Sequence, residues 1–128
     1  QHQVVGIAIL CCTSGAFLWD MEQACTAVRE FIAGAAQDRY ANDLMLRSAV
    51  ERQLQNIGEA LTQLAKLDPE LAARVPRHRQ LIGFRNVLVH GYAGLNNEEV
   101  WRVVHENLPD LHAAVTALRQ DADSPPQP

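Results

Sequence analysis

Aromatic residues are scarce in this sequence and make up only 5% of its 128 residues. Hydrophobic residues still account for 48%, so the core must be filled mostly by leucine, valine, isoleucine and alanine. These side chains suit helices that pack on helices, and a chain of this length can bury one modest core. We therefore expect a single helical domain.

Cysteine is also scarce. Cys11, Cys12 and Cys25 lack the paired spacing of a zinc site, and their odd number leaves one thiol unpaired under any disulfide scheme. This favours a reducing, cytoplasmic environment. The apolar run at residues 4–12 is too short to span a bilayer and follows no basic segment, so we predict neither a membrane anchor nor a targeting signal. Residues 1–16 are treated as an N-terminal extension of uncertain status.

No stretch alternates apolar and polar residues between turn signals, so the sequence predicts no strand. Apolar positions instead recur at steps of three and four, which is typical of amphipathic helices. The clearest such stripe consists of Leu46, Val50, Leu54, Ile57, Leu61 and Leu64. Helices are expected over residues 17–35, 42–67, 77–90, 96–104 and from 109 onward.

The predicted fold is an all-α, up-and-down bundle of four to five helices with short helical turns, occupying residues 17–120. Asn42 is expected to cap the second helix, and Asp68 with Pro69 to end it and start a short turn. Pro109 is expected to open the last helix. Residues 121–128, which are rich in proline, should not continue this helix and should form a disordered tail.

Acidic residues are missing from residues 71–97, although the whole chain is acidic, with 11 Lys and Arg against 15 Asp and Glu. The net charge of −4 argues against a general polyanion binder. This local basic zone is either a directed site or a solvated cationic helix face. Its cationic and titratable residues are Arg74, Arg77, His78, Arg79, Arg85 and His90.

Residues 85–92 read Arg-Asn-Val-Leu-Val-His-Gly-Tyr. Arginine offers a forked, permanently charged donor for phosphate oxygens, and histidine can exchange a proton near neutral pH. On a helix, Asn86 and His90 lie one turn apart with Arg85 beside them. The set suits chemistry on a phosphodiester. The alternative is that His90 only caps the helix C-terminus.

This octet resembles the motif of the HEPN-domain ribonucleases, and more closely that of the HepT-like toxins: Arg, four residues, His, one residue, Tyr. Arg85, His90 and Tyr92 match this spacing, and Asn86 fits its polar position. Residues 50–60, 99–101 and 107–111 also resemble segments of that family. The similarity extends over residues 18–119, whereas the first residues of the chain have no counterpart.

The resemblance implies a metal-independent endoribonuclease that acts as the toxin of a toxin-antitoxin pair. It assigns catalysis to Arg85 and His90 and a supporting role to Asn86. It implies a minimal nucleotidyltransferase as the antitoxin, which would silence the toxin by transferring AMP to Tyr92. It implies no metal and no cofactor for the toxin's own reaction.

Such cleavage uses the ribose 2′-hydroxyl as nucleophile, and it needs a base, an acid and positive charge at the phosphorus. One His90 cannot be base and acid in the same concerted step, so we expect a homodimer that joins two sites. Arg74, Arg77 and Arg79 could then bind flanking phosphates of the RNA.

Two other functions remain open at this point. The chain could be a non-catalytic helical module that binds a nucleotidyltransferase, or a structural dimer whose polar octet only caps a helix. Gly58 and Glu59 lie within a helical segment, and close helix packing would explain the glycine. Glu59 could orient Arg85 or Arg52 across the bundle, or it could simply be solvated.

Overall fold

The computed structural model describes residues 2–90 and 96–123, with side chains for residues 14–88 and 96–121. Within these ranges the protein is helical and has no strand, which confirms the all-α prediction. Its elements are α1 His2–Ile32, α2 Gln37–Asn42, α3 Leu44–Leu67, α4 Pro69–Ala73, α5 His78–His90, α6 Asn97–Arg102, the π-helix η1 Val103–Asn107, and α7 Leu108–Asp123. Of the helices described, none has the length and apolarity needed to cross a bilayer.

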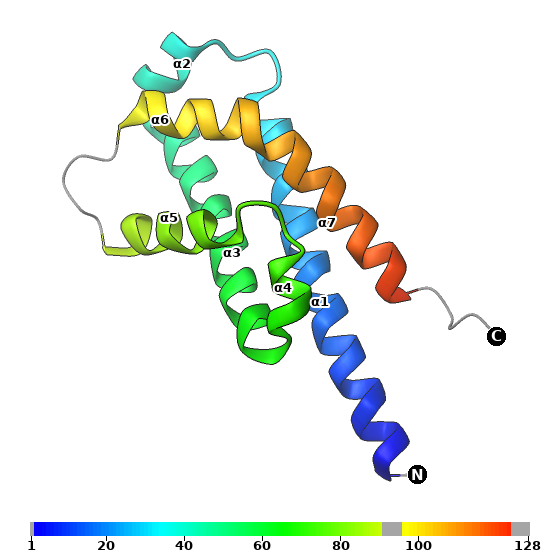
Figure 1. The fold of residues 1–128 in the computed structure, drawn as a ribbon. Coiled ribbons are helices and arrows are strands. Elements are labelled where there is room, and N and C mark those ends of the chain that lie inside the picture. Colours follow the sequence, from blue (N-terminus) through cyan, green and yellow to red (C-terminus); the bar gives the residue numbers. More distant parts are fainter. Residues whose placement is uncertain (1, 91–95, 124–128) are drawn as a thin grey trace.

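Helix α3 is the central element of the bundle. It packs against α1 on one side and α5 on the other, while α7 runs alongside α1 (Figure 1). The stripe predicted from the sequence is confirmed, because all six of its side chains from Leu46 to Leu64 are buried. Burial of these aliphatic side chains against α1 and α5 holds α3 in place. The core therefore consists mainly of leucine, valine and alanine, in line with the composition.

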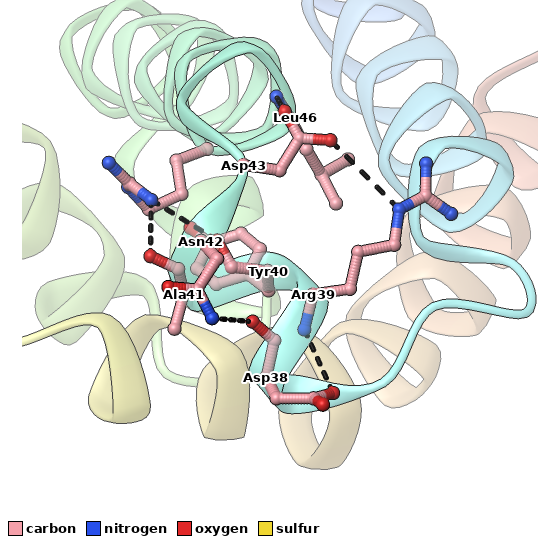
Figure 2. Close-up of polar contacts among 8 residues, drawn as sticks. Asp38, Arg39, Tyr40, Ala41, Asn42, Asp43 and Leu46 are labelled. Atoms are coloured by element: carbon pink, nitrogen blue, oxygen red, sulfur yellow. Dashed lines mark hydrogen bonds and ion pairs between the residues drawn. The ribbon is translucent and has the colours of Figure 1, made fainter.

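The start of α3 differs from the prediction by one residue. Asn42 belongs to the short helix α2, and the cap is Asp43, whose Oδ1 accepts a hydrogen bond from the Leu46 N–H at 3.0 Å (Figure 2). Arg47 reinforces the junction by donating to the backbone carbonyl of Ala41 at 2.5 Å. The predicted Asn42 cap is thus wrong. Its amide instead donates to the carbonyl of Asp38 at 2.8 Å.

The predicted break at Pro109 is absent, because α6, η1 and α7 form one continuous helical segment. A proline inside an α-helix removes one backbone hydrogen bond and clashes with the preceding turn. Here the backbone widens into the π-helix η1 just before the proline, and the Leu108 N–H bonds to the Val103 carbonyl. The segment then continues to Asp123, so the first three residues of the predicted tail are helical. Residues 124–128 lie outside the described part.

The ends of the other helices follow the sequence signals. Asp68 caps α4, accepting from the Leu71 N–H at 3.1 Å, and Pro69 occupies the first helical turn. Asn96 caps α6 by accepting from the Glu98 N–H at 2.8 Å. At the other end of the chain, α1 includes residues 2–16, so the predicted N-terminal extension continues the first helix. It ends at Ile32, three residues earlier than predicted.

Candidate functional site

Helix α5 carries the residues of the motif. Arg79, Gly83, Asn86 and His90 follow one another at steps of four, three and four, which places them along one side of the helix. Arg79, Gly83 and Asn86 are exposed, and a Cβ added at Gly83 would contact nothing within 4 Å. His90 is the last residue of α5, but its side chain is outside the described part. Tyr92 is among residues 91–95, which the structure does not describe.

Arg85 lies on a different flank of α5 and faces α3. Its Nη2 donates to Oε2 of Glu59 at 2.6 Å, and its Nη1 donates to Oδ1 of Asn86 at 2.9 Å. The Arg85 side chain is 27% exposed, so the guanidinium sits at the edge of the bundle rather than free in solvent. The structure thus brings together Arg85, Asn86 and Glu59. Glu59 is the residue whose role the sequence left open.

Gly58 explains how Arg85 approaches α3 so closely. A Cβ built on Gly58 would lie 2.2 Å from Cβ of Arg85 and 2.7 Å from its Cγ. It would also lie 3.3 Å from the backbone oxygen of Leu81. These distances are too short for a real side chain, so the two helices can cross here only because residue 58 has none. The close helix packing proposed for Gly58 is confirmed.

The carboxylate of Glu59 is held in its charged form. Gln63 donates to its Oε1 at 3.0 Å while Arg85 binds the other oxygen. The hydrogen bond from Gln63 and the charge of Arg85 outweigh desolvation and lower the pKa of Glu59 below its ordinary value. The ion pair with Arg85 therefore persists at neutral pH. Glu59 is about half exposed, so the main effect of this pair is to orient Arg85 rather than to stabilise the fold.

The three other arginines predicted for substrate binding lie in different surroundings. Arg79 is exposed on the same side of α5 as Asn86. Arg74 follows α4 and lies 4.0 Å from the Asp121 carboxylate of α7, with both side chains mostly exposed. Arg77 precedes α5 and donates to Oδ1 of Asn107 in η1. Of these three, Arg79 is the one that shares a helix side with the motif.

A groove borders α5 on the side away from Glu59. It separates α5 from α6, η1 and α7 and has a volume of about 530 Å³. Its floor is apolar, with Leu81, Phe84 and Val87 from α5. Arg77 and Asn107 lie at its wall. Sequence reasoning missed this groove, because it depends on the spacing between two helices that are distant from each other in the chain.

Over the described residues, no three or more His, Cys, Asp or Glu side chains gather in a way that could hold a metal ion. Cys25 is buried in α1, and this burial raises the pKa of its thiol to about 12. The thiol is therefore protonated and unreactive at neutral pH.

Comparison with known proteins identifies the family. Residues 21–118 match the sequence profile of the ribonuclease HepT-like family. This chain belongs to that family. The match confirms the resemblance found in the octet and its flanking segments, and it covers α3 with Glu59 and α5 with Arg85.

The chain covers more than nine tenths of the length of three curated relatives. A protein of Methanocaldococcus jannaschii, named as a candidate RNase, is 33% identical over 100 residues, which are 78% of this chain and 91% of the relative. A candidate RNase of Caldanaerobacter subterraneus subsp. tengcongensis is 30% identical over 104 residues, 81% and 92% of the two chains. A candidate ribonuclease HepT of Thermococcus cleftensis is 28% identical over 104 residues, 81% and 94%. No solved structure matches the chain significantly.

The helix crossing leads to a first prediction, on stability. Gly58→Ala forces α3 and α5 apart, and overpacking of this kind costs about 1–3 kcal/mol. Alanine returns up to about 1 kcal/mol of helix propensity. Since the added Cβ would lie only 2.2 Å from Cβ of Arg85, we expect an overpacking cost near the upper end of the range and a net loss of about 2 kcal/mol in the free energy of unfolding. Urea denaturation followed by circular dichroism measures this loss.

Gly83→Ala is the matched control, since it makes the same substitution in α5 at a position where an added Cβ meets nothing. Within a single chain it should leave stability unchanged or raise it by up to about 1 kcal/mol. If the two variants shift the urea midpoint in the same direction and to the same extent, the close crossing at Gly58 does not constrain the fold.

Proposed function

We propose that this HepT-like chain is a metal-independent endoribonuclease, the toxin of a toxin-antitoxin pair, with a site made of Arg85, Asn86 and His90. The observation that carries the proposal is the fixed guanidinium of Arg85. Glu59 and Asn86 hold it at the edge of α5, five residues before His90, in a chain of a ribonuclease family. A guanidinium oriented in advance binds a phosphate with little loss of side-chain entropy.

The reaction is a transesterification at the phosphodiester. The ribose 2′-oxygen attacks the phosphorus, its proton passes to a base, and the 5′-oxygen leaves with a proton from an acid. His90 serves as the proton-transfer group and Arg85 stabilises the charge that develops on the phosphorane oxygens. Asn86 holds Arg85 and offers a further amide donor. These groups supply each part of the chemistry without a metal ion.

Glu59 acts through Arg85 and is a positioning residue. Its carboxylate occupies one nitrogen of the guanidinium, and the Asn86 oxygen accepts from the other terminal nitrogen. An incoming phosphate therefore binds an arginine whose direction is already set. The same pair reduces the net positive charge at the site, which suits transient binding of RNA followed by release of the products.

A homodimer completes the site in this proposal. The exposed side of α5 with Arg79, Gly83 and Asn86 is flat at its middle, because Gly83 carries no side chain. Packing this side against its own copy across a two-fold axis brings two His90 residues to one cleft, so that one acts as base and the other as acid. Arg79 then lies along the cleft and binds a flanking phosphate. Arg74 and Arg77 lie farther out.

The proposed partner is a nucleotidyltransferase antitoxin that transfers AMP to Tyr92. Tyr92 follows His90 by two residues in the sequence, so an adenylyl group on its oxygen would be attached close to the proposed RNA site. Its negative charge repels the substrate phosphate and competes for Arg85. Modification would thus silence cleavage without unfolding the protein.

One observation favours the alternative, a non-catalytic helical module that binds a nucleotidyltransferase. Arg85 already has two partners within this chain, which is also what a purely structural arginine would have. The two functions differ in a simple test. A binding module leaves RNA intact, whereas the proposed toxin cleaves it.

The second prediction concerns that cleavage. Purified protein incubated with total RNA in EDTA should produce discrete fragments, because no step requires a metal. Arg85→Ala and His90→Ala should each reduce the cleavage rate by about 100-fold or more, in line with the loss of one charge-stabilising or proton-transfer group. Gel analysis of the fragments measures the rate.

Arg39→Ala is the charge-matched control, since Arg39 lies on the surface of α2 and pairs with Asp43. It should cleave at the wild-type rate. Circular dichroism should show equal helical content in all four proteins. Cleavage that appears only with added magnesium refutes the metal-free mechanism, and no cleavage under any condition favours the binding module.

The third prediction is the oligomeric state. Light scattering at micromolar concentration should give twice the monomer mass of 14.2 kDa. Gly83→Arg places a long charged side chain in the middle of the proposed dimer side and should produce monomers with little cleavage activity. An active wild-type monomer removes the argument for a shared site.

The fourth prediction concerns Tyr92. With the partner nucleotidyltransferase and ATP, the wild-type chain should gain the mass of one AMP and lose cleavage activity. Tyr92→Phe keeps the ring but has no acceptor oxygen, so it should fold, gain no mass and continue to cleave. Tyr40→Phe is the control: because Tyr40 is buried, this variant should gain the mass of one AMP as the wild type does. An AMP increment on Tyr92→Phe places the modification elsewhere.

A further inference from the structure

The groove beside α5 has the composition of a small-ligand site. Binding pockets typically combine an apolar floor with a few directed polar groups and have volumes of about 300–1,000 Å³. This groove has about 530 Å³ and an apolar floor that includes Leu81 and Phe84. Both side chains are only partly buried, so Phe84 leaves aromatic surface open to the groove. It is large enough for one nucleotide.

Backbone strain is concentrated at one end of this groove. Arg77 has φ of 58°, and it is the one non-glycine residue with positive φ in the described part of the chain. A bulky residue in this left-handed region is unfavourable, and glycine would adopt it more easily. The strain persists at Arg77 although the position could be glycine, and such strain tends to occur where a side chain has a function.

The opposite wall carries a second irregular feature. Asn107 is the last residue of the π-helix η1, and its Oδ1 accepts a hydrogen bond from Arg77 Nη1. Single π-turns inside α-helices are frequent at functional sites. Two unusual backbone segments, far apart in sequence, thus meet in one side-chain contact. That contact engages Nη1 of Arg77, and both residues line the groove. The other two guanidinium nitrogens, Nε and Nη2, can still form a fork of two donors.

The polar groups at this end are complementary to guanine. Asp110 lies one turn beyond Asn107 and lines the same groove. Guanine offers two acceptors, O6 and N7, to an arginine fork, and two donors, N1–H and the exocyclic amino group, to a carboxylate. Adenine presents an amino group where the arginine needs an acceptor. Phe84 provides the apolar surface on which a base can stack.

We infer that this groove binds a guanine base of the RNA substrate, with Arg77 and Asp110 reading its edge and Phe84 stacking on its face. The inference rests on the proposed function, since it names a base of the RNA that the α5 site cleaves. Arg77 directly precedes α5, and the eight residue steps of α5 from His78 to Asn86 span about 12 Å along the helix. The guanine is therefore more than one nucleotide away from the phosphate that is cut.

Nucleotide binding tests the groove without any cleavage. GMP, AMP, CMP and UMP are titrated into the full chain labelled with nitrogen-15, and amide shifts are followed by NMR. GMP should shift amides around Arg77, Phe84 and Asn107 and should bind on the order of tenfold more tightly than AMP. Arg77→Gly suits the backbone at this position, so it should fold, and it should lose this preference. Asp110→Asn should weaken GMP more than AMP.

Arg39→Ala changes the net charge as Arg77→Gly does, and it should bind GMP as the wild type does. In parallel, cleavage is mapped on RNAs that contain a single guanine moved through a uridine-rich sequence. The cut position should follow the guanine in the wild type and not in Arg77→Gly.

The outcomes separate the two proposals. GMP binding in the groove without any RNA cleavage refutes the proposed function and leaves the guanine site standing. RNA cleavage that ignores guanine, with no GMP shifts in the groove, refutes the guanine site alone. Equal shifts by all four nucleotides, or GMP binding that survives in Arg77→Gly, also overturns the assignment of Arg77.

Discussion

The arrangement of this protein depends on the crossing of α3 and α5 at Gly58 and Arg85. The backbone of α3 comes so close to α5 that a Cβ on residue 58 would lie 2.2 Å from Cβ of Arg85. The next residue of α3, Glu59, then meets the Arg85 guanidinium at 2.6 Å. One residue without a side chain and one carboxylate thus set both the distance between the helices and the direction of the key arginine.

This crossing also separates the two long sides of α5. Because Arg85 is turned toward α3, the side with Arg79 and Asn86 is left exposed. The groove opens next to that side and has Gly83 among its lining residues. A helix buried on all sides could not present a motif and border a groove at once. Here α5 is attached mainly through its contact with α3, with Leu88 as its buried anchor. The exposed side of α5 and the groove beside it are therefore surfaces that core packing does not require.

The sequence predicted those features of the fold that depend on a regular spacing of residues along the chain. The stripe on α3 follows a period that only a helix satisfies, and its burial could be read directly. Asn42 and Asp43 are both good capping residues, so the local sequence does not show which of them caps α3. Asn42 is the last residue of α2, and this leaves Asp43 as the cap. Pro109 is a strong helix-opening signal, but here the backbone accommodates the proline by widening into the π-helix η1 just before it. The proline itself is the one sign of this wider turn in the sequence. The positive φ of Arg77 has no sequence signal at all.

The same limit applies to prediction of the candidate site: local spacing shows which residues share a helix side, but not which residues of other helices contact them. Spacing alone placed Arg85, Asn86 and His90 on neighbouring flanks of one helix, because helical periodicity is a local property. The partner Glu59 lies 26 positions earlier and becomes relevant only through the tertiary crossing. Gly58 was the one indication in the sequence, since a glycine inside a strong helix costs stability unless something close requires it. A glycine next to an acidic residue in a helix can therefore indicate that a second helix packs closely there and that its basic side chain pairs with the carboxylate.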